Sequence, residues 1–121
     1  MRDFFIATVV IILLLAGVIV LSELGIARIE EYLSALPKEE TPPEEAATAL
    51  KTLEERIKGD LFLLNTIFSH TRTDALELAV AGAVAAARSG DEVELTIKHA
   101  ELQSLLLDMQ RDLTPHPADM I

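Results

Sequence analysis

The sequence has 121 residues and carries 20 acidic against 10 basic side chains, a net charge of −10, which argues against nucleic acid and anionic lipid as binding surfaces for its soluble part. No Trp, one Tyr and four Phe leave no aromatic platform on which bases would stack. The lack of cysteine excludes disulfides, thiolate chemistry and a lipid-modified cysteine anchor. Outside one apolar run, about 100 residues remain, enough for one small domain.

An uncharged run from Phe4 to Leu21 dominates the start of the chain. As a helix, its 18 residues would span about 27 Å, close to the roughly 30 Å hydrocarbon core of a bilayer. A cleaved signal peptide is the alternative, but its apolar region is typically about 7 to 15 residues long, and the small residues Gly25 and Ala27 are flanked by bulky ones. We therefore expect a retained anchor that contacts the lipid bilayer through Phe4 to Leu21.

Basic groups near the ends of this run indicate its orientation only weakly. Arg2 and the amino group precede the run, and Arg28 and Lys38 follow it, so the count is nearly balanced. Because the short flank before the run needs little translocation if it stays inside, we expect a single-pass cell-membrane protein. Its N-terminus would lie in the cytoplasm and its soluble domain outside the cell membrane.

Beyond Glu23 the apolar pattern narrows to one stripe. Spacings of three and four residues join Ile26, Ile29, Leu33 and Leu36, which predicts that the helix continues into water. Pro37 disfavours helix at the residue before it, so the helix should end near Leu36. Packing against the domain's own helices is the favoured interpretation of this stripe, because three turns are short for the alternative, a coiled-coil dimer.

A charged, proline-rich hinge over Pro37 to Pro43 leads to a predicted helix over 42–68. We expect Thr41 as its N-cap and Pro42 at its first helical position. Gly59 and Asp60 weaken its middle and mark a possible kink. Apolar side chains recur along it at Ala46, Leu50, Leu53, Ile57, Leu61, Leu64 and Phe68.

Residues 69–73 predict a short break, with Thr71 or Thr73 as the cap of an alanine-rich helix over 73–88. Gly90 should end that helix, and Asp91 should cap the next one, over 91–113. Two helices joined so tightly must run antiparallel. Core positions of the two helices are predicted at Leu76, Ala79, Val80, Ala83, Val84 and Ala87, and at Leu95, Leu102, Leu105, Leu106, Met109 and Leu113.

These elements predict an all-α protein in which an N-terminal transmembrane helix continues into a small antiparallel helical bundle. The expected organisation is a transmembrane helix with its extension over 1–36, the hinge over 37–43, an acidic bundle over 44–113 and a flexible tail over 114–121.

The residues indicate no catalytic, cofactor-binding or metal site. His70 comes closest, because Asp74 and Glu77 follow it at helical spacing and histidine with carboxylates can bind zinc. The favoured interpretation places His70 in an inter-helix turn, and His99 and His116 on the surface, because none has the spacing of a known metal motif. Acidic pairs such as Glu54 and Glu55 are interpreted as solvated helix faces rather than calcium ligands.

The layout resembles an uncharacterised family of short, single-pass bacterial membrane proteins, domain of unknown function forty-three sixty-three. The comparable residues are Phe62, Phe68 to His70, Leu76 to Ala87, the turn Ser89 to Asp91, and Glu94 to Leu113. The resemblance implies a bacterial membrane location and no established activity.

The expected function is a non-enzymatic one, a membrane-anchored helical interaction or scaffold protein without cofactors, whose partner is another protein or a second copy of itself. Clustered titratable groups in a pocket, which an enzyme of this size would need, are not indicated by the sequence. The alternative is a sensor in the envelope that binds a metal or small ligand at His70.

Overall fold

The computed structural model describes residues 1–38 and 41–113, and over these residues it contains five α-helices and no strand. The helices are α1 (Arg2–Ala35), α2 (Pro43–Gly59), α3 (Leu61–Ile67), α4 (His70–Ser89) and α5 (Glu92–Leu113). The expected all-α architecture with a long, apolar first helix is thereby confirmed. Glu39, Glu40 and the predicted tail over 114–121, with His116, lie outside the described residues.

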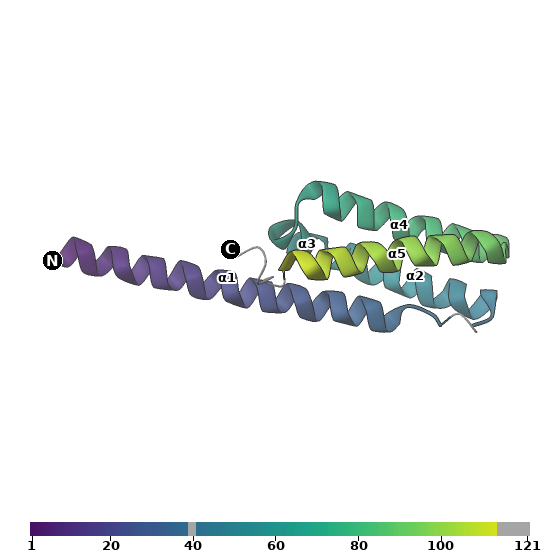
Figure 1. Ribbon diagram of the computed structural model, residues 1–121, viewed down its shortest axis with the longest axis horizontal. Coiled ribbons are helices and arrows are strands. Elements are labelled where there is room, and N and C mark those ends of the chain that lie inside the picture. Colours follow the sequence, from purple (N-terminus) through teal and green to yellow (C-terminus); the bar gives the residue numbers. More distant parts are fainter. Residues whose placement is uncertain (39–40, 114–121) are drawn as a thin grey trace.

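Four helix segments run alternately up and down to form a bundle, and the start of α1 projects far beyond it (Figure 1). We call residues 2–24 the free half of α1. Residues 25–35 form the bundle together with α2, α4 and α5, and we call them the packed half of α1. α4 packs against α2 and α5, and α5 also packs against α1, whereas α1 and α2 approach each other less extensively. The short α3 lies at the end of the bundle from which the free half emerges.

The core lies where the predicted apolar stripes meet. The buried face of α4 includes Ala83, Ala86 and Ala87, small residues that favour close packing of neighbouring helices. The packed half of α1 contributes to the same core, which favours the interpretation that its stripe packs within the chain. The buried members are Ile29, Tyr32, Leu50, Leu53, Ile57, Leu64, Phe68, Leu76, Val80, Ala83, Val84, Ala87, Leu102, Leu106 and Met109.

The phase of α1 differs slightly from the predicted stripe. Gly25, Ile29 and Tyr32 are buried, whereas Ile26 and Leu33 are only half-buried. The helix ends as expected, because Leu36 has an extended backbone before Pro37.

The start of α2 corrects one prediction. Pro42, with φ −58° and ψ 148°, is the N-cap and Pro43 the first helical residue, and no side chain caps the helix. The predicted cap Thr41 and first position Pro42 are therefore each one residue too early. The second proline disfavours helical backbone at the first, so helix starts only at Pro43.

The single helix predicted over 42–68 is also divided, because Asp60 separates α2 from α3. Asp60 has φ −96° and ψ 5°, and its N–H still bonds to the carbonyl of Arg56 at 3.0 Å. Gly59 lowers helix propensity, and the Asp60 carboxylate accepts a hydrogen bond from α1, so the predicted kink becomes a break.

α4 begins three residues earlier than predicted. Ser69 is its N-cap, and its hydroxyl accepts a hydrogen bond from the Arg72 N–H at 3.2 Å. Thr73, one of the two predicted caps, is instead buried inside the helix, where its hydroxyl donates to the Ser69 carbonyl at 3.2 Å. A threonine that bonds back to the preceding turn is compatible with helix, so the predicted break contracts to Phe68 and Ser69.

The turn between α4 and α5 is formed as predicted. Gly90 has φ 74°, a left-handed conformation that favours glycine, and it ends α4. Asp91 Oδ1 then accepts a hydrogen bond from the Glu94 N–H at 3.1 Å.

Candidate functional site

The free half of α1 presents its apolar side chains to the surroundings on every side. Phe4 is 78% exposed and Leu14 is 64% exposed, and none of its most apolar window is buried inside the protein. Among the described residues, α1 is the one helix long and apolar enough to cross a membrane, by length and composition. The predicted span from Phe4 to Leu21 lies entirely within this free half.

The change from free to packed helix occurs at Gly25. A Cβ atom at Gly25 would lie 2.6 Å from Leu113 Cδ1 and 3.2 Å from Ile67 Cγ2, so glycine permits α1 to approach α3 and α5 closely here. Gly25 lies four residues, or about 6 Å, beyond Leu21. The apolar run and the bundle are therefore joined by continuous helix, with no flexible linker between them.

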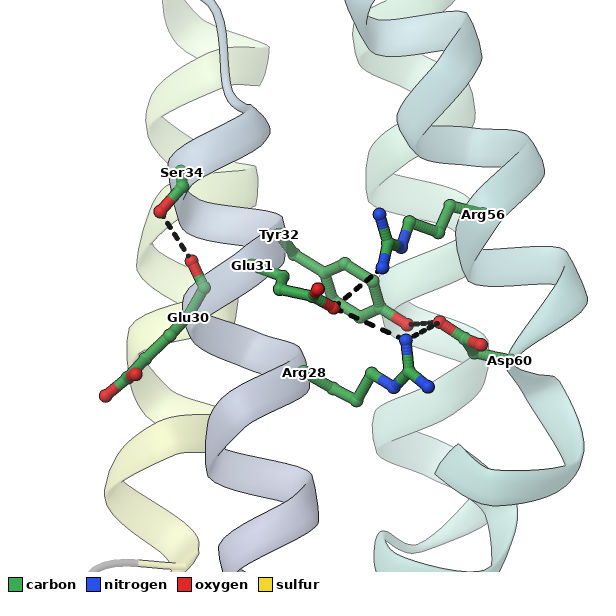
Figure 2. A network of polar contacts seen from close by, with 7 residues as sticks. All are labelled: Arg28, Glu30, Glu31, Tyr32, Ser34, Arg56 and Asp60. Carbon is green, nitrogen blue, oxygen red and sulfur yellow. Dashed lines mark hydrogen bonds and ion pairs between the residues drawn. The ribbon is translucent and has the colours of Figure 1, made fainter.

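A group of polar side chains connects the packed half of α1 to α2 (Figure 2). We call Arg28, Glu31, Tyr32, Arg56 and Asp60 the Tyr32 network. The fully buried Tyr32 donates from its hydroxyl to Asp60 Oδ2 at 2.5 Å. Arg28 Nη1 lies 3.3 Å from Glu31 Oε2 and 3.9 Å from Asp60 Oδ2. Arg56 Nη2 reaches the same Glu31 oxygen at 2.8 Å, so the network joins α1 to α2, which pack less extensively than α2 and α4, α4 and α5, or α1 and α5.

The Tyr32 network is balanced in charge and keeps its tyrosine neutral. Burial raises the pKa of Tyr32 well above its usual value, and the hydrogen bond to Asp60 raises it further. A tyrosine that acts as a nucleophile or base near neutral pH would need the opposite shift. This group was not predicted from the sequence, although Tyr32 follows Ile29 by three residues and precedes Leu36 by four, the spacing of a buried helix face.

The three residues of the alternative sensor do not form a joint site. His70 is the first residue of α4 and is exposed, so it lies within the helix rather than in an inter-helix turn. Among the described residues, no group of three His, Asp or Glu side chains lies close enough to hold a metal ion. Asp74 and Glu77 line an open groove of about 420 Å³ between α2 and α4, whose lining does not include His70.

Glu54 lines the same groove and is paired within its own helix. Its carboxylate accepts a hydrogen bond from Lys51 Nζ at 2.9 Å and lies 4.0 Å from Lys58 Nζ. The bond from Lys51 lowers the pKa of this buried carboxyl, which is therefore charged at neutral pH. Glu54 was predicted as a solvated residue, but it is 6% exposed because α4 covers it from one side.

A second pocket, of about 460 Å³, lies at the end of the bundle away from α3, beside the α1–α2 connection. His99, predicted as a surface residue, is half-buried there, and its Nε2 lies 2.9 Å from the Pro37 carbonyl oxygen. A carbonyl can only accept, so the contact favours the tautomer with the proton on Nε2. His99 thus ties α5 to the α1–α2 connection. Other lining residues are Lys38, Thr41, Pro42, Pro43, Ala46, Glu92, Leu95, Thr96, Ala100 and Gln103.

α5 also exposes apolar side chains on the face turned away from the core. Val93 is 72% exposed, Ile97 47% and Leu107 43%, and the small residues Ala100 and Ser104 between them are exposed as well. We call these five residues the α5 outer stripe. We call the predicted core positions of this helix, Leu95, Leu102, Leu105, Leu106, Met109 and Leu113, the inner stripe. The outer stripe was not predicted, although its members show the same spacing of three and four residues.

Comparison with known proteins adds no assignment, because no family model, curated protein or solved structure matches the chain.

Proposed function

We propose that this chain is a single-pass cell-membrane protein whose bundle is a non-enzymatic interaction or scaffold module. The exposed apolar run from Phe4 to Leu21 in the free half of α1 supports the membrane location. Each fully exposed large apolar side chain costs about 1.5–3 kcal/mol in water relative to burial, and a bilayer removes that cost. The resemblance to domain of unknown function forty-three sixty-three implies the same location, in bacteria.

The distribution of charge along the bundle supports a membrane at the end where α3 lies. Residues 61–69 contain no charged side chain, and Ile67 lies beside Gly25 at the base of the free half. At the far end, Glu44 and Glu45 lie in the first turn of α2, and Asp91 and Glu92 lie at the start of α5. The other charged side chains at the α3 end are paired, Arg72 with Asp112 at 3.1 Å and Asp60 with Arg28 at 3.9 Å. This end is therefore repelled less by an anionic headgroup layer than the acidic end is.

An interaction role requires an accessible surface, whereas catalysis requires reactive titratable groups gathered in a pocket. The charged groups of the Tyr32 network pair with one another, and the raised pKa of Tyr32 leaves it neutral. A sensor that binds a small ligand is the second candidate, and the groove that gathers Asp74 and Glu77 favours it. That site would lack His70, which departs from the trio suggested by the sequence.

Membrane insertion and topology are tested on the full chain. After alkaline carbonate extraction of cell membranes, we expect the protein in the pellet, and release into the supernatant would overturn the anchor. With no native cysteine present, a Thr48→Cys variant reports the side on which the bundle lies. Labelling of this α2 position by an impermeant thiol reagent in intact cells is expected, and protection until lysis would place the bundle in the cytoplasm.

The interaction role is tested by cross-linking in native membranes and by metal analysis of the detergent-solubilised protein. We expect a reproducible cross-linked protein or dimer that a His70→Ala variant retains. Stoichiometric metal that is lost in Asp74→Asn with Glu77→Gln would overturn the interaction role in favour of a sensor at the groove. Loss of cross-linking in Asp74→Asn with Glu77→Gln, but not in His70→Ala, would instead locate the contact at the groove.

A further inference from the structure

The α5 outer stripe has the spacing of a coiled-coil seam. Successive members are separated by four, three, four and three residues, so that they fall on one face of the helix. Leu102, Leu106 and Met109 of the inner stripe are fully buried in the bundle. One helix therefore has two apolar faces, and only the inner one is covered in the described structure.

The two borders of the outer stripe differ in charge. In heptad register, Glu94, Glu101 and Asp108 follow one border, and Thr96 and Gln103 follow the other. Lys98 lies 3.8 Å from Glu94 and 3.5 Å from Glu101, and it offsets part of the acidic border from within α5. One border is thus acidic, and the other is neutral and able to donate hydrogen bonds.

These borders discriminate between the two ways in which a second α5 can pack on the stripe. In a parallel pair of helices, each border meets the unlike border of the other helix, so Gln103 of one copy faces Asp108 of the other. In an antiparallel pair, like borders meet, and carboxylates oppose carboxylates. Gln–Asp contacts are favourable, whereas contacts between like charges are unfavourable.

The anchor imposes the same orientation. Two copies inserted in one bilayer with the same topology are related by rotation about the membrane normal, so their α5 helices run parallel. This step rests on the proposed membrane function. Ala100 and Ser104 at the centre of the stripe are small. They allow the two helix axes to approach to the low end of the usual separation of about 8–10 Å.

We propose that a second copy of this chain docks in parallel on the α5 outer stripe, from Val93 to Leu107. The interface is isologous, so each stripe residue lies near its equivalent across the twofold axis. The seam ends where Arg111 occupies the next stripe position and pairs with Asp108 at 3.7 Å. Each bundle is then attached to the membrane through its own anchor and to the second copy through the α5 outer stripe.

Self-cross-linking of single cysteines tests this proposal in native membranes. Ser104→Cys changes one atom at an exposed stripe position, and oxidation should give a disulfide-linked dimer. Thr48→Cys on the outer side of α2 is the matched control and should stay monomeric at equal expression. Adding Ile97→Lys to Ser104→Cys should reduce the linked fraction at least about tenfold, because it places like charges across the seam.

Two results would overturn the proposal. Ser104→Cys that remains monomeric in membranes, while its thiol still reacts with a small maleimide, would show that the stripe does not self-associate. Preferential linking of Ser104→Cys to Ala100→Cys in a mixture would indicate antiparallel packing. Carbonate extraction of the same membranes separates the two hypotheses, since release of the chain contradicts the anchor, and retention without cross-linking contradicts only the docking.

Discussion

The free half and the packed half of α1 belong to one unbroken helix, yet they differ in how their side chains are distributed. From Phe4 to Leu21 the helix is apolar on every side, and every side is exposed. In the packed half, Ile29 and Tyr32 are buried in the bundle while Glu30 and Ser34 are exposed. The comparison shows that the angular distribution of apolar residues, more than their number, indicates which surroundings a helix requires.

Replacing one isoleucine with aspartate in each half should give the largest difference in stability between the buried and the exposed surroundings. Ile29 is fully buried, so Ile29→Asp places an unpaired carboxylate in the core at a cost of several kcal/mol, comparable to the whole stability of a small domain. Circular dichroism of the detergent-solubilised full chain should show loss of cooperative melting.

The matched change Ile12→Asp lies in the free half, where the side chain is 58% exposed. We expect unchanged melting of the bundle but a smaller membrane-inserted fraction, since aspartate near a span centre costs about 2.5–3.5 kcal/mol. Equal effects of the two substitutions on melting would mean that the halves are not distinct environments.

Most of the fold was predictable because the apolar positions of α2, α4 and α5 repeat with helical spacing and lie at the predicted core. The boundaries that failed depend on short-range competition. Ser69, rather than Thr71 or Thr73, caps α4. It directly follows the buried Phe68, and its hydroxyl accepts a hydrogen bond from the Arg72 N–H. Sequence spacing alone does not contain that information.

A second exchange compares the two glycines of α1. Gly25→Leu must displace Ile67 and Leu113, and we expect a loss of about 2–3 kcal/mol in the free energy of unfolding, within the usual cost of overpacking. Gly17→Leu meets nothing within 4 Å and gains the same helix propensity. Chemical denaturation in detergent should therefore separate the variants, and equal stability would contradict the close approach at Gly25.

The candidate surfaces were less predictable than the fold, for a related reason. Tyr32 joins Asp60 across 28 positions of sequence, and His99 meets Pro37 across 62, so neither pair leaves a local pattern. The α5 outer stripe does form a local pattern in the sequence. It was not predicted because the inner stripe alone accounts for an amphipathic helix. His70 drew attention through spacing alone, and the fold does not bring it to the groove of Asp74 and Glu77.

The third change tests the polar link between the packed half and α2. Tyr32→Phe keeps the ring in the core and removes the hydroxyl that donates to Asp60, while Arg28 stays 3.9 Å from that carboxylate. We expect a loss of about 1–2 kcal/mol at neutral pH. Ser34→Ala, which removes an exposed hydroxyl from the same helix, is the control and should leave the stability unchanged.

The pH dependence of this difference carries the sharper test. Since burial and Asp60 raise the pKa of Tyr32 in the folded protein, the stability contributed by neutral Tyr32 is fully present below the usual tyrosine value of about 10 and is lost progressively as the pH rises above it. Tyr32→Phe has no group to ionise there, so its disadvantage relative to the unmodified chain should shrink above that pH. All other side chains are the same in both proteins, so their contributions cancel in the comparison. A difference that stays constant from neutral to strongly alkaline pH would mean that the hydroxyl is not held in the buried hydrogen bond, and that the packed half of α1 is retained by its apolar contacts alone.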